Sequence, residues 1–220
     1  LSLVELCRRC VGLPILCVVG ALVLYTFLPF GAGIKYDKAI YDLFYTLNGL
    51  LGAPINVCAK YIVLFIIFGA FLERTGISNF FIDLANSIAG SASGGPAKVA
   101  VLSSALCGMV SGSSVGNTVT TGSITIPMMK KTGYKPEFAG AVEAAASTGG
   151  QIMPPIMGAA AFLMAEYVGE PFNYGKIALL AILPAVLYFT GIFIAVHLEA
   201  KKLGLKGIPR NQLPKMKDLM

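Results

Sequence analysis

Long apolar stretches separated by short charged segments dominate the chain. Uncharged runs cover residues 11–34, 99–129, 144–165 and 177–196. Each run has 20 residues or more, which is enough for a helix to cross roughly 30 Å of hydrocarbon. The pattern therefore predicts an all-α, polytopic membrane protein.

The sequence predicts two kinds of helix, spans that cross the membrane and amphipathic helices that lie along it. We expect four spans, at residues 11–30, 54–73, 137–166 and 176–197. Two further segments mix charged residues with apolar ones at helical spacing, which favours helices lying in the membrane interface. These amphipathic segments lie within residues 31–52 and 78–90.

The run at 99–129 carries no charge, yet 15 of its 31 residues are Gly, Ser, Thr or Asn. Helix-weakening residues gather at its centre, 111–118. About 12 residues remain on either side, and such an arm spans only about 18 Å. Neither arm is long enough to cross, so we predict a re-entrant helical hairpin over 98–131 with its tip at Gly112–Gly116.

Lysine and arginine placement leaves the topology open. With a hairpin and a cytoplasmic N-terminus, 13 of the 17 basic residues lie inside and 4 outside. A chain with five spans and the opposite orientation gives 12 inside and 5 outside, so both obey the positive-inside rule. We prefer the hairpin because of its polar composition and because Arg8 and Arg9 precede the first span.

The span at 137–166 is interrupted at 147–155 by two glycines and two prolines, which predicts a broken helix with exposed carbonyls. A half-helix that begins near Asn117 and Thr118 directs the positive end of its dipole at the hairpin tip, where an anionic substrate can bind. The opposing helix C-terminus offers carbonyls to a cation. Neutral oxygen ligands suitable for Na⁺ are supplied by Ser111, Ser113, Ser114, Asn117 and Thr118. The alternative is that the small residues only allow close helix packing through Gly108, Gly112 and Gly116.

Glu143 is the acidic residue deepest in an apparent span, six residues after Glu137. Intramembrane carboxylates are functional candidates. The residue either takes part in coupling, for example by carrying a proton, or braces the broken helix, and the sequence leaves both roles open.

Composition excludes several classes of protein. Hydrophobic residues make up 56% of the chain and charged residues 13%, with a mean hydropathy of +0.76, which excludes a water-soluble globule. The net charge of +6 is explained by basic residues at helix ends, so no nucleic-acid partner is expected. No HExxH or P-loop motif occurs, so we do not expect an enzyme.

The stretch SGSSVGNTVTTGSITIPMMKKTGYKPEFAGAVEAAASTGGQIMPPIMGAAAFLMAE, residues 111–166, closely resembles TRAP transporter permeases, in particular the fused permeases of the TAXI type. VELCRRCVGLPIL and YIVLFIIFGAFLERTG are similar to the same proteins. The resemblance implies one inverted-repeat half of an elevator-type secondary transporter in a bacterial or archaeal cytoplasmic (inner) membrane. It also implies Na⁺ coupling and an organic acid (carboxylate) substrate delivered by an extracytoplasmic substrate-binding protein. Its other implied partners are a small membrane subunit or fused upstream helices, and a second half of the permease.

The resemblance further implies which residues bind. The Na⁺ ligands it implies are the side chains of Ser114 and Asn117 with backbone carbonyls near Gly150, Met153 and Pro155. The substrate residues it implies are Ser113, Asn117, Thr118 and Gln151, with Glu143 as a candidate for coupling. The expected segments are 1–97 with the N-terminal spans, 98–131, 132–200 with the broken helix and last span, and a basic cytoplasmic tail or linker at 201–220. Two alternatives are a dicarboxylate/Na⁺ symporter that needs no binding protein, and a non-transporting membrane scaffold.

Overall fold

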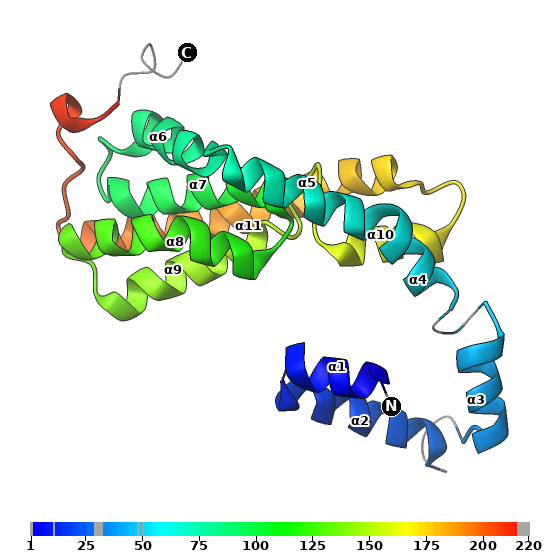
Figure 1. Ribbon diagram of the computed structural model, residues 1–220. Helices are drawn as coiled ribbons and strands as arrows, with labels where there is room; N and C mark the ends of the chain where they lie inside the picture. Colours follow the sequence, from blue (N-terminus) through cyan, green and yellow to red (C-terminus); the bar gives the residue numbers. More distant parts are fainter. Residues whose placement is uncertain (1, 11, 29–32, 48, 50, 215–220) are drawn as a thin grey trace. The chain divides into compact units, whose positions relative to one another are not determined.

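The computed structural model describes residues 2–10, 12–28, 33–47, 49 and 51–214, and this part of the chain is helical without a strand (Figure 1). It divides into two compact units, Leu1–Asn56 and Val57–Met220. The all-helical prediction is confirmed for these residues.

The first unit contains three helices, α1 (Ser2–Cys10), α2 (Leu13–Phe27) and α3 (Tyr36–Tyr45). The guanidinium groups of Arg8 and Arg9 bind the Glu5 carboxylate and lower its pKa. Helix α2 is apolar but has 15 residues, a length of about 22 Å. It is shorter than the expected span at 11–30, of which residues 11, 29 and 30 lie outside the described part. Helix α3 confirms a helix within the amphipathic segment 31–52.

The second unit holds the remaining helices. Their bounds are α4 Ala53–Val57, which begins before the boundary of the unit, a π-helical turn Cys58–Ile62, α5 Val63–Arg74, α6 Ile77–Ala89, α7 Gly95–Ser111, α8 Ser114–Lys131, α9 Pro136–Gly149, α10 Ala159–Val168, α11 Tyr174–Lys202 and a 3-10 turn Arg210–Gln212. Two of these stretches, Ala53–Leu72 and Tyr174–Lys202, are long and apolar enough to cross a membrane. They coincide with the expected second and last spans, and α6 confirms the amphipathic helix expected at 78–90.

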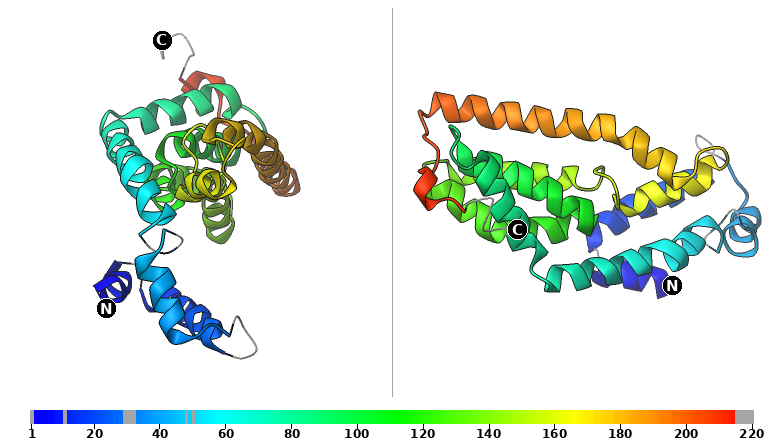
Figure 2. Two further views of the ribbon diagram at one scale, coloured as in Figure 1. Left: turned by 90° about the vertical axis from the view of Figure 1, so that its right-hand side faces the viewer. Right: turned by 90° about the horizontal axis from the view of Figure 1, so that it is seen from above.

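Helices α7 and α8 form an antiparallel hairpin (Figure 2). The Asn117 side chain donates to the Ser104 carbonyl near the tip, while Met128 packs against the cluster that contains Val99 toward the open end. Gly112, with φ 59°, ends α7, and its amide donates to the Gly108 carbonyl at 3.0 Å. A left-handed conformation of this kind favours glycine. The structure thus has two helical arms joined at the predicted tip.

Two details of the predicted hairpin are wrong. Helix α8 begins at Ser114 rather than near Asn117, because the Ser113 hydroxyl caps it by accepting the Gly116 amide at 3.2 Å. The arms have 17 and 18 residues instead of 12, or about 25 and 27 Å. Threonine hydroxyls in α8 bond carbonyls one turn back, as Thr118 does to Ser114, so these polar side chains find partners within their own helix.

Small residues pack α7, α8, α9 and α11 closely together. The main core cluster includes Ala97, Ala100, Ala139, Ala146 and Ala200, together with larger side chains such as Met129 and Val196. Alanine lets helix axes approach, so the hairpin and α9 are held as one packed layer against α11.

The predicted break after α9 is confirmed. The helix ends at Gly149, an irregular segment follows, and α10 begins at Ala159. The Tyr174 hydroxyl donates to the carbonyls of Pro155 and Ile156, at 2.6 and 2.5 Å. The Tyr174 ring stacks on Phe162 with centroids 4.4 Å apart, so α11 helps to fix the end of the break.

The segment after α11 folds back onto the turn between α6 and α7, a contact that the sequence did not predict. The Ile208 amide donates to the Gly90 carbonyl at 2.9 Å, and the Ser93 hydroxyl donates to the Leu205 carbonyl at 3.0 Å. Leu205 also packs against the main core cluster. The described part of the expected tail therefore covers this end of the unit.

Candidate functional site

The hairpin tip lies directly against the break after α9. A Cβ placed on Gly108 would lie 2.3 Å from the Gly150 Cα, so only glycine allows this approach. The Ile156 amide donates to the Met109 carbonyl at 3.3 Å, which adds a backbone bond between the two segments. The two interruptions recognised in the sequence therefore form one junction.

Asn117 lies at this junction and is 1% exposed. Its side-chain Nδ2 donates to the Ser104 carbonyl at 2.8 Å. Its Oδ1 is buried and has no hydrogen-bond partner among the described residues. A buried amide oxygen without a partner is unfavourable and suits an oxygen-preferring cation.

Gln151 connects the two segments beside Asn117. Its Nε2 donates to the Ser114 hydroxyl oxygen at 2.9 Å. Gly150 also lies close, because a Cβ built on it would be 3.5 Å from the Asn117 Nδ2. Of the five Na⁺ ligands implied by the resemblance, Ser114, Asn117 and Gly150 are brought together.

The other two implied ligands lie further along the break. The Met153 amide donates to the Gly150 carbonyl at 3.3 Å, and the Pro155 carbonyl accepts the Tyr174 hydroxyl. The carbonyls of Gly150 and Pro155 thus already accept bonds, although a carbonyl oxygen has a second lone pair.

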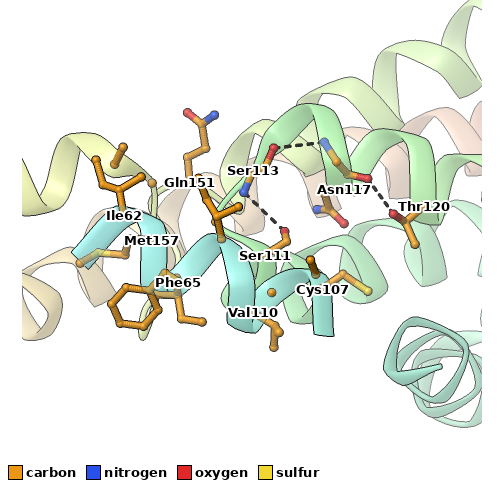
Figure 3. A pocket seen from close by; sticks show the side chains of 18 of the residues that line it. Ile62, Phe65, Cys107, Val110, Ser111, Ser113, Asn117, Thr120, Gln151 and Met157 are labelled. Carbon is orange, nitrogen blue, oxygen red and sulfur yellow. Dashed lines mark hydrogen bonds between the residues drawn. The ribbon is translucent and has the colours of Figure 1, made fainter. Parts of the chain in front are cut away.

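A cavity of about 760 Å³ opens beside the tip (Figure 3). Its polar side is formed by Ser111, Ser113, Asn117 and Thr120 from the hairpin and by Gln151 from the break. Its apolar side includes Ile62, Phe65, Ile66 and Phe162. No lining residue is charged, so binding of an anion here depends on helix dipoles, amide and hydroxyl groups, or a bound cation.

The structure places three of the implied substrate residues, Ser113, Asn117 and Gln151, in the wall of this cavity. The fourth, Thr118, is absent from the lining, and its hydroxyl bonds within α8. Sequence reasoning missed Thr120, although it lies three residues after Asn117 on one helix face. It also missed the wall that Phe65 contributes, because an apolar residue in an apolar span gives no local signal.

Glu143 lies behind the junction and is completely buried. Hydroxyl groups from three helices surround its carboxylate. Ser104 donates at 2.9 Å and Ser147 at 3.1 Å, and Thr121 and Thr125 bond the two carboxylate oxygens. These four donors satisfy a carboxylate that has no basic partner among the described residues.

The same group is linked to Asn117. The Ser104 residue that donates to Glu143 through its hydroxyl also accepts the Asn117 amide through its carbonyl. Thr121 bonds both Glu143 and the Asn117 carbonyl. Glu143 therefore holds α7, α8 and α9 together around Asn117, whose Oδ1 has no partner among the described residues.

Comparison with known proteins gives one family over the entire chain. Residues 1–220 match the family described as tripartite ATP-independent periplasmic transporter, DctM component. A C4-dicarboxylate TRAP transporter large permease protein from Pseudomonas aeruginosa is 30% identical over 150 residues, 68% of this chain and 34% of the relative. An isethionate TRAP transporter permease protein from Oleidesulfovibrio alaskensis is 28% identical over 202 residues, 92% of this chain and 30% of the relative.

A third relative is a 2,3-diketo-L-gulonate TRAP transporter large permease protein from Escherichia coli, 23% identical over 201 residues, 91% of this chain and 46% of that protein. The chain spans about a third to a half of the length of these relatives.

Proposed function

The chain belongs to the DctM family of TRAP transporter large permeases, which are integral membrane proteins, and we propose that it forms one half of a Na⁺-coupled importer of organic acids. The TAXI-type subdivision stays a prediction. The observation that carries the proposal is the unpartnered, buried Oδ1 of Asn117 at the junction of hairpin tip and break.

Na⁺ is a co-substrate in this scheme. The residues that fit it are Ser114 and Asn117 through side-chain oxygens, with backbone carbonyls of Gly150, Met153 and Pro155 from the break. Binding there links α8 to the segment after α9, and both segments also border the cavity. The ion therefore stabilises the wall against which the substrate binds.

The substrate site we propose is the cavity beside the tip, with Ser113, Asn117, Thr120 and Gln151 as its polar residues. Thr118 does not line the cavity, so the proposed site does not include it. The relatives are named for C4-dicarboxylate, isethionate and 2,3-diketo-L-gulonate, which are all anions. The cavity wall has no basic side chain, so the Na⁺ charge and the N-terminus of α8 supply the attraction for an acid group. Each Na⁺ that enters down 100 mV supplies about 2.3 kcal/mol.

The hairpin is re-entrant in this proposal, with its tip at mid-membrane and an elevator-like shift carrying the site across. The partners are an extracytoplasmic binding protein, a small membrane subunit or fused upstream helices, and a second half of the permease. The membrane is the cytoplasmic (inner) membrane of a bacterium or archaeon. Glu143 takes part in coupling by holding Asn117 in place rather than by contacting the ion.

The test uses the full-length permease reconstituted with its small subunit and binding protein. We expect Na⁺-dependent uptake of the acid to fall at least tenfold when Ser114→Ala and Asn117→Ala are combined. The matched control is Ser123→Ala, because Ser123 is an exposed residue of α8 whose hydroxyl donates to the Thr120 carbonyl of the same helix. Unchanged uptake in the double variant contradicts the site, and uptake without the binding protein favours the symporter alternative.

A further inference from the structure

Lys98 is a lysine at the start of α7 that is only 5% exposed. Its Nζ lies 5.3 Å from the centroid of the Phe193 ring of α11. No carboxylate or hydrogen-bond acceptor pairs with this ammonium group among the described residues. The cation–π contact leaves the hydrogen-bond donors of this ammonium group unused, so an anionic partner is favoured.

Two more nitrogen-bearing groups face the same place from α11. His197, one turn after Phe193, has a buried Nδ1 that finds no hydrogen-bond partner in the part of the chain that the structure describes. Lys98 interacts electrostatically with both His197 and Lys201. The acidic residue between them in sequence, Glu199, is paired with Lys202 at 3.5 Å.

An apolar groove of about 240 Å³ runs between α7 and α11. Its lining residues are Val101, Leu102, Ala105, Phe189, Thr190 and Phe193. Helical spacing places Lys98 on the α7 face of Leu102 and Ala105, and His197 on the α11 face of Phe189 and Phe193. The groove therefore begins at the cluster of nitrogen-bearing groups and continues along apolar side chains.

We propose that this groove binds an anionic phospholipid, with an acyl chain between α7 and α11 and the phosphate at Lys98, His197 and Lys201. A phosphate group supplies the acceptor oxygens that the ammonium and imidazole groups lack. The apolar lining favours a lipid over a free phosphate ion. Basic sites between membrane helices recognise anionic headgroups in this way. The proposal is independent of the Na⁺ and substrate sites, which lie at the other end of the hairpin.

The test measures phosphatidylglycerol retained by the full-length permease after purification from mixed phosphatidylglycerol and phosphatidylcholine nanodiscs, by mass spectrometry. We expect Lys98→Met to reduce the retained phosphatidylglycerol at least fivefold and Lys98→Arg to preserve it. The control is Lys130→Met, which removes an exposed lysine at the open end of the same hairpin. Lys201→Met removes a second charge of the proposed site at an exposed position, where the interior is not disturbed. It should therefore also reduce the retained phosphatidylglycerol.

A further variant separates a lipid from a free anion. Ala105→Leu fills the groove without changing a charge, so it should reduce phosphatidylglycerol retention as well. Inorganic phosphate should give no thermal stabilisation of the wild type. Equal retention in wild type and Lys98→Met overturns the proposal. Stabilisation by phosphate alone, or unchanged retention in Ala105→Leu, overturns the lipid assignment.

Discussion

Helices α7 and α11 of the second unit differ strongly in the fraction of their residues that is buried. Helix α7 contains several Ser and Gly residues, and 12 of its 17 residues are buried. In α11 only 4 of 29 residues are buried, and its leucines are largely exposed. In lipid an apolar outer face costs nothing, whereas polar groups require partners inside the protein. The hairpin layer is thus specified by particular hydrogen bonds, while α11 requires mainly length and composition.

The largest effect on stability is expected from removal of the buried Glu143 carboxylate. Glu143→Ala leaves a cavity and deprives hydroxyls on three helices of their acceptor, so we expect a loss of about 3 kcal/mol in the free energy of unfolding. Thermal unfolding of the purified protein in detergent measures it. The control is Glu137→Ala on the same helix, where the side chain is exposed and the expected loss is below about 1 kcal/mol. Similar losses in the two variants contradict the distinction.

A smaller effect is expected from closing the contact between tip and break. Gly108→Ala puts a methyl group against the Gly150 backbone, which must move, at a cost of about 2 kcal/mol. Gly140→Ala in α9 meets no atom within 4 Å, so it should be neutral or stabilise by up to about 1 kcal/mol. Parallel unfolding curves test the pair. If both substitutions stabilise, the close approach at Gly108 is refuted.

The smallest effect concerns the turn between α8 and α9. Burial, with a lesser contribution from Glu199, raises the pKa of Tyr134 to about 12. Since its ordinary pKa is about 10, the fold favours the neutral phenol. The resulting stability is complete below pH 10 and is lost as pH rises through 12. The free energy of unfolding should therefore fall less between pH 10 and 12 in Tyr134→Phe than in the wild type. Tyr167→Phe, at an exposed position, is the control and should behave like the wild type. An unchanged fall in Tyr134→Phe contradicts this prediction.

Much of the architecture was predictable because it depends on local composition. Polar small residues without charge at 99–129 predicted the hairpin, and the glycines and prolines at 147–155 predicted the break. Both interruptions lower helix propensity strongly enough to be recognised in one sequence. The structure brings Ser114, Asn117 and Gly150 together. Their role as Na⁺ ligands, which the family resemblance implies, stays a prediction.

The remaining features depend on packing between distant segments. Ser104 and Thr125 reach Glu143 from 39 and 18 residues away, and no spacing rule connects them. The burial of Lys98 was not foreseen, because a lysine at a helix end normally extends toward water. Helix α8 begins three residues before its predicted start, because the Ser113 side chain serves as the N-cap.

The contact of residues 203–213 with the α6–α7 turn has a mechanical consequence. It joins the end of α11 to the helices that carry the hairpin, so in the elevator-like shift proposed above these parts would move as one body. Helix α5 is connected to this group through Thr75 and Gly76, and Gly76 has φ 80°. In the proposed shift, a rotation of α5 relative to this group changes the backbone at these two positions, so stiffening them should slow translocation while leaving ligand affinity intact.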